Sequence, residues 1–164
     1  MKTQITQNGC IALRHTVATL AYRAAKALRG APAGFSEFRP AEESRSAGEI
    51  LAHMCDLMNW ALSQMEGREK WRNSKPKEWS ETSARFFDAI TALDQYLASG
   101  APLHANAEQV FQGAVADALT HTGQIAMLRR MAGARVRGEN YYRARIETGR
   151  TGADQAKSVS EFGK

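Results

Sequence analysis

The sequence predicts an all-α fold, a four-helix bundle with a short irregular segment at its C-terminal end. Apolar residues recur at spacings of three and four in four separate stretches, and no stretch alternates polar and apolar residues as a half-buried strand would. Glycine, proline and polar residues separate the stretches. We expect residues 1–150 to form the bundle domain and residues 151–164 to form a flexible tail.

The size and composition of the chain agree with one such domain. Its 164 residues are enough to bury roughly 70% of the surface of the unfolded chain. Cys10 and Cys55 are the only cysteines, too few for a disulfide scaffold and not spaced as a zinc knuckle or a redox pair. Charged residues interrupt every apolar run well before the length of a membrane span. We therefore expect a soluble, cytoplasmic protein.

The first two helices have clear ends. The first ends at the sequence GAPAG, residues 30–34. The second begins after Ser46, and Glu49 three residues later completes a capping box. It ends near Gly67. The apolar face of the first helix is Cys10, Leu13, Val17, Leu20, Ala24 and Leu28, and that of the second is Ile50, Met54, Leu57, Met58, Ala61 and Met65.

The other two helices follow a polar connection in which Pro76 excludes helix continuation. The third begins at about Ser80 and ends at the sequence SGAP. Asn106 is the predicted N-cap of the fourth helix, which runs to Gly133. The apolar face of the third helix is Phe86, Phe87, Ile90, Leu93 and Leu97.

Three polar residues fall on helix faces that should be buried. His53 shares its face with Ile50 and Leu57. Asp117 and His121 are four residues apart, so they differ by about 40° around the axis of the fourth helix. A buried carboxylate without a partner costs several kcal/mol, so it must be paired or coordinate a metal. The spacing alone fits a hydrogen-bonded Asp/His pair and a metal site equally well.

Two segments carry a resemblance to a known family. EILAHMCDLMNWAL (residues 49–62) and ADALTHTGQIAMLRRMAG (residues 116–133) together resemble the DinB-like (DinB/YfiT-like) metalloenzyme superfamily, over about residues 8–145. The resemblance implies four helices in an up-down-down-up arrangement. It also implies a metal site built from His53, Asp117 and His121, with Asp117 at a position where the family commonly has a histidine.

Two histidines and one carboxylate suit a divalent transition metal, with zinc first and nickel or iron as alternatives. Glu49 and Asp56 are within one turn of His53 and could orient its ring, or could be a helix cap and a surface charge. Gln124 could hydrogen-bond to a ligand or be a buried structural amide. His15 and His104 are expected at the surface.

The resemblance implies a metal-dependent hydrolase or a transferase that uses a low-molecular-weight thiol, acting on a small-molecule substrate as a homodimer. The alternative is a non-catalytic stress-response or binding module whose metal site is structural or empty. Arginines are frequent after residue 128, but they lack interleaved aromatic residues or a recognised nucleic-acid module, so we do not expect nucleic-acid binding. We expect no association with membranes.

Overall fold

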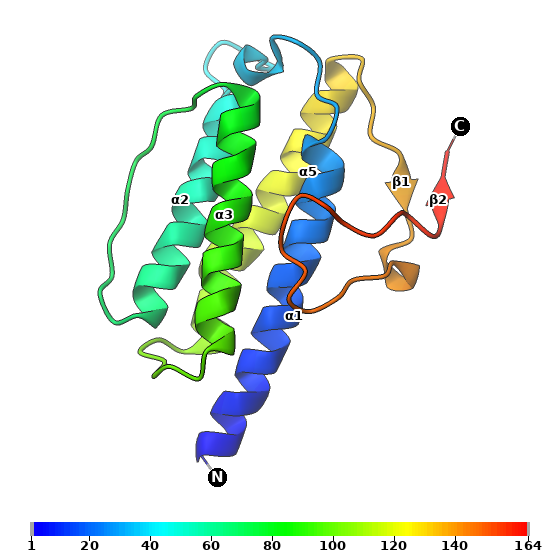
Figure 1. Ribbon diagram of the computed structural model, residues 1–164. Helices are drawn as coiled ribbons and strands as arrows, with labels where there is room; N and C mark the ends of the chain where they lie inside the picture. Colours follow the sequence, from blue (N-terminus) through cyan, green and yellow to red (C-terminus); the bar gives the residue numbers. More distant parts are fainter. Residues whose placement is uncertain (1, 164) are drawn as a thin grey trace.

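The predicted four-helix bundle is confirmed by the structure, a computed structural model that describes residues 2–163 (Figure 1). The fourth helix is continuous but contains three segments, two α-helical and one π-helical. Two short 3-10 turns and one pair of very short strands complete the fold. The helical elements are α1 (Lys2–Leu28), α2 (Ala47–Met65), α3 (Trp79–Ala98), α4 (Ala107–Val110), the π-helical η2 (Phe111–Val115) and α5 (Ala116–Met131).

The helices run up, down, down and up (Figure 1). Around the bundle, α2 packs against α3 and α5, and α1 packs against α5 and α3. Because α2 and α3 run in the same direction, the connection between them, residues 66–78, must cross the length of the bundle. An α-helix the length of α2 spans about 28 Å, which an extended chain of this connection's length can cover.

The core is formed by the apolar faces that the sequence predicts. The capping box at the start of α2 is confirmed: the Ser46 hydroxyl accepts from the Glu49 amide, and the Glu49 carboxylate accepts from the Ser46 amide. The Asn106 side chain likewise accepts from the amides of Glu108 and Gln109. The largest side chains with almost no exposed surface are Leu20, Leu51, Met54, Met58, Met65, Phe86, Ile90, Leu93 and Ile125.

The π-helical segment η2 (Phe111–Val115) was not predicted. Val110, Ala114 and Ala118 are buried and spaced by four residues, a spacing that the apolar face of a regular α-helix also shows. The burial pattern therefore gives no signal for the wider π turn, which ends directly before α5 and Asp117.

The C-terminal segment, expected as a flexible tail, lies against α1 and α3 (Figure 1). Strand β1 (Gly138–Glu139) pairs antiparallel with β2 (Glu161–Phe162). Thr151 is buried and its hydroxyl lies 3.0 Å from that of Thr91 in α3. Single polar contacts of this kind leave no periodic pattern in the sequence. In the described part of the chain, no helix is long and apolar enough to cross a membrane.

Glu139 joins this segment to α1. Its fully buried carboxylate accepts from the Tyr22 hydroxyl at 2.7 Å, the Lys26 ammonium at 2.8 Å and the Ser158 hydroxyl at 3.0 Å. Burial raises the pKa of Glu139, but the hydrogen bonds from Lys26, Tyr22 and Ser158 together outweigh it and hold the pKa below its usual value. The ionised carboxylate is therefore the form that holds the segment in place.

We predict that Glu139→Gln releases the C-terminal segment, since the neutral amide loses the ion pair and offers one oxygen to three donors. Hydrogen exchange of residues 151–163 should accelerate by about tenfold or more, which corresponds to roughly 1.5–3 kcal/mol. The pKa of Glu139 is lower in the folded protein than its ordinary value of 4.5. Docking of the wild-type segment should therefore be complete above about pH 4.5 and should be lost as the pH falls further.

The matched control is Glu147→Gln, the same change at an exposed position. Equal exchange in the two variants would show that Glu139 does not hold the segment.

Candidate metal centre

The three residues expected to bind a metal lie together between α2 and α5. His53 is on α2, and its Nε2 is 3.4 Å from Oδ2 of Asp117 on α5. The other carboxylate oxygen, Oδ1, is 3.5 Å from Nε2 of His121. The two imidazole rings are nearly perpendicular, with centroids 5.0 Å apart. The packing of two helices thus places three donor groups around one point.

These distances fit a metal ion. Each residue offers one ligand atom, and the three atoms all lie within 4.8 Å of one another. In a tetrahedral site with bonds of 2.0–2.1 Å, neighbouring ligand atoms are about 3.3 Å apart. The shortest contacts of the two histidines with the Asp117 carboxylate, 3.4 and 3.5 Å, are close to this value, and they end on different carboxylate oxygens. The group can therefore hold a divalent ion with three protein ligands and an open position.

The exposure of the three side chains is uneven. His53 and His121 are mostly covered, with 19% and 12% of their side chains exposed, whereas Asp117 is 46% exposed. The expectation that Asp117 is buried is therefore wrong, because η2 and α5 place its carboxylate at the edge of the interface between the helices. Because the Asp117 carboxylate is half exposed, it does not need a metal ion to offset a cost of burial. The argument rests on the convergence of the three donors.

His53 lies against an aromatic cluster formed by Trp60 of α2 and Trp71 of the connection between α2 and α3. The Trp71 ring lies 5.6 Å from the His53 ring, and the Trp60 ring lies 5.8 Å from that of Trp71. Burial lowers the pKa of His53 more than the hydrogen bond to Asp117 raises it, and His121 and Arg45 lower it further. The neutral imidazole is favoured, and it is the form that binds a metal.

Gln124 holds the other histidine in the orientation that a ligand needs. The amide oxygen of Gln124 lies 2.7 Å from Nδ1 of His121. A proton on Nδ1 is donated to this oxygen, which leaves the Nε2 lone pair directed at Asp117 and the candidate site. Hydrogen bonds of this kind fix the tautomer of metal-binding histidines.

Glu49 and Asp56 have other partners. Glu49 belongs to the capping box of α2 and lies 3.4 Å from Arg39. Asp56 is buried, and it accepts from the Ser74 amide and the Ser74 hydroxyl, each at 2.7 Å. The expected hydrogen bond from either residue to His53 is thus replaced by a helix cap and by an anchor for the connection between α2 and α3. Asp56 is therefore not the surface charge that was the alternative expectation for it, whereas Glu49 is the helix cap that was the alternative for it.

The surface is hollowed on both sides of the site. A groove of about 470 Å³ reaches His121, and a second hollow of about 430 Å³ reaches Asp117. The groove is lined mainly by Ile50, Met127, Leu128 and Met131, with Arg45 and Gln124 among its polar members. The second hollow is lined by Leu57, Trp60, Gln112, Gly113, Ala116, Asp117 and Thr120.

The sequence did not reveal every residue around the site. Trp71 lies in an irregular connection and Arg45 precedes a helix cap, so neither belongs to a periodic pattern. A tryptophan in an otherwise polar connection was the one available signal. His15 and His104 are exposed, as expected, and His15 lies 3.2 Å from the Thr148 hydroxyl.

Comparisons of the chain with protein-family models, with curated proteins and with solved structures found no match. The functional argument therefore rests on the geometry of the site.

We predict that the purified protein, without chelator or affinity tag, contains about one divalent transition metal ion per chain. His53→Ala and His121→Ala should each lower the metal content to about a tenth or less by removing one of three ligands. His15→Ala and His104→Ala are matched controls and should keep the wild-type content. Elemental analysis measures all five proteins. Folded wild-type protein that neither contains nor takes up metal would contradict the assignment.

A second prediction concerns Gln124. Gln124→Ala should weaken zinc binding by about tenfold, because His121 then loses the hydrogen bond that fixes its tautomer. Gln124→Glu keeps an acceptor oxygen and should keep most of the affinity, and Gln109→Ala serves as a control at an exposed position of α4. Competition with a chromogenic chelator gives the dissociation constants. Wild-type affinity in Gln124→Ala would exclude this role.

Proposed function

We propose that the protein is a metal-dependent enzyme of the DinB-like superfamily that acts on a small molecule bound beside His121. The observation that carries the proposal is the position of the His53, Asp117 and His121 donor atoms between two hollows of the surface. Structural zinc sites are usually closed by four protein ligands, whereas catalytic sites have three and keep one position open. Three donors and a half-exposed Asp117 match the catalytic pattern.

A bound divalent ion supplies Lewis-acid activation of a nucleophile, which is water in a hydrolase and a low-molecular-weight thiol in a transferase. The residues of the chain provide the rest. His53, Asp117 and His121 hold the ion, and Gln124 orients His121. The apolar wall of the groove binds the carbon skeleton of a substrate, and Arg45 at its edge attracts an anionic substituent.

The two hollows favour transfer between two molecules over hydrolysis. Hydrolysis needs room for one organic substrate beside the metal. Thiol transfer needs room for two organic molecules there, the electrophile on one side of the metal and the body of the thiol on the other. The groove at His121 is apolar and suits the electrophile. The hollow at Asp117 includes the polar Gln112 and Thr120 and suits a polar thiol.

The test is a rate measurement on the metal-loaded protein. Thiol transfer to 1-chloro-2,4-dinitrobenzene is measured with glutathione, cysteine and coenzyme A. Hydrolysis of p-nitrophenyl acetate is measured as a separate assay. We expect thiol transfer. Transfer with at least one thiol should exceed the metal-free rate by about tenfold or more, and His121→Ala should abolish it while circular dichroism shows an intact bundle.

Metal-dependent hydrolysis without thiol transfer would identify a hydrolase instead. If the bundle unfolds in His121→Ala together with the loss of metal, and neither reaction depends on the metal, the ion is structural and the enzymatic proposal is wrong.

A further inference from the structure

A third hollow of the surface is separate from the two beside the candidate metal centre. It has a volume of about 250 Å³ and lies between the end of α1, the end of α5 and the C-terminal segment. It shares no lining residue with the two hollows beside the metal centre. Six of its lining residues are cationic: Lys26, Arg29, Arg129, Arg135, Arg137 and Lys157.

Arg129 forms the buried wall of this cavity and has 6% of its surface exposed. Its guanidinium donates to the carbonyl oxygens of Ala27, Arg29 and Gly30 at the end of α1, and to that of Ala134. None of these four acceptors is a carboxylate. The C-terminal end of a helix offers only about half a negative charge, so a substantial part of the charge of Arg129 is not neutralised.

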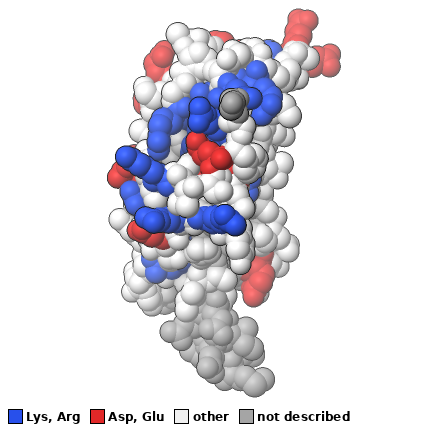
Figure 2. Space-filling model, turned by 90° about the vertical axis from the view of Figure 1, so that its right-hand side faces the viewer, with Lys and Arg blue, Asp and Glu red and all other residues white. Residues whose placement is uncertain are grey.

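The carboxylates near the cavity do not balance the cations. Lys26 pairs with Glu139 at 2.8 Å and with Glu161 at 2.7 Å, and Arg137 lies 3.8 Å from Glu161. Set against these two carboxylates, five of the described cations, Lys26, Arg29, Arg129, Arg137 and Lys157, leave an excess of three positive charges among the groups compared. Figure 2 shows basic side chains gathered around a few acidic ones on the side of the molecule that carries the C-terminal segment.

We propose that this cavity binds a phosphate or diphosphate group. Guanidinium and ammonium groups are the side chains that recognise phosphate oxygens, and they converge here from three segments of the chain. The concave shape suits a compact anion, whereas a long nucleic acid needs a basic stripe or ridge. The group can belong to a free phosphorylated metabolite or to a phospholipid headgroup, which present the same oxygens.

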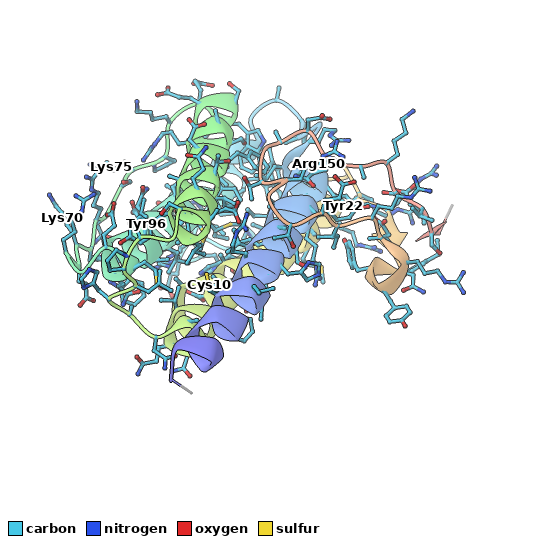
Figure 3. The ribbon with its side chains drawn as sticks, turned by 60° about the horizontal axis from the view of Figure 1, so that its bottom comes forward. Cys10, Tyr22, Lys70, Lys75, Tyr96 and Arg150 are labelled. Atoms are coloured by element: carbon cyan, nitrogen blue, oxygen red, sulfur yellow. The ribbon has the colours of Figure 1, made fainter. Side chains whose placement is uncertain are left out.

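The experiment uses sodium pyrophosphate, titrated by calorimetry into the full-length protein at low ionic strength. Lys157→Gln and Arg29→Gln remove exposed cations of the cavity and should each weaken binding by roughly three- to tenfold, since each removes one charge-assisted contact. Lys75→Gln is the matched control. Lys75 is exposed and lies on the side of the molecule opposite Tyr22 (Figure 3). The Lys75→Gln protein should therefore bind pyrophosphate with wild-type affinity.

Vesicles of phosphatidylcholine with and without phosphatidylinositol 4-phosphate separate the two sources. Binding to the phosphoinositide vesicles that pyrophosphate displaces indicates a lipid headgroup, and binding of pyrophosphate without vesicle binding indicates a free metabolite. Either result supports the cavity as a phosphate site.

Three results of the pyrophosphate titration would overturn the proposal. They are no binding at millimolar concentration, equal weakening in Lys157→Gln and Lys75→Gln, and wild-type affinity in both Lys157→Gln and Arg29→Gln. Wild-type affinity in both cavity variants would mean that pyrophosphate binds elsewhere, for instance at the metal centre, because neither substitution changes a residue of that centre. Tighter binding of a 20-nucleotide single strand, weakened equally by Lys157→Gln and Lys75→Gln, would indicate an extended polyanion surface and also contradict the proposal.

Discussion

The packing of α2 against α5 is the contact on which the candidate site depends. Neither helix alone carries a complete set of metal ligands: α2 contributes His53, and α5 contributes Asp117 and His121. In the bundle, α2 packs against both α3 and α5. Because α2 and α3 run in the same direction, a connection must cross the length of the bundle between them. The same topology requires the long connection over residues 66–78, and that connection places Trp71 beside His53. The topology thus supplies both the ligands and part of their surroundings.

The site is held by a core that does not depend on it. The fully buried side chains of α1, α2, α3 and α5 form one continuous apolar cluster, and the polar donors lie at its edge. A bundle of this kind is stable through its apolar faces, so the exposed position of Asp117 costs little and leaves the metal accessible. Asp56, by contrast, is buried and stabilises the connection through Ser74. Its role is structural, although it is close to His53 in the sequence.

The helices could be predicted from the sequence because each has an apolar face with helical periodicity and recognisable ends, such as Ser46 with Glu49. The three donor residues could be predicted from their positions on these faces and from the family resemblance. Three features could not. The π turn leaves no signal in the sequence, because Val110, Ala114 and Ala118 are spaced as on an ordinary helix face. Trp71 reaches the site through tertiary packing of an irregular segment. The contacts of Glu139 join residues that are more than a hundred positions apart.

The central claim is that His53, Asp117 and His121 bind one metal ion together. X-ray absorption spectroscopy of the zinc-loaded protein tests it most directly, because imidazole rings give characteristic multiple scattering. The account predicts about two imidazole ligands per zinc, with nitrogen and oxygen donors at about 2.0–2.1 Å and no sulfur in the protein alone. A spectrum without imidazole scattering, or one with thiolate sulfur from Cys10 or Cys55, would contradict the account.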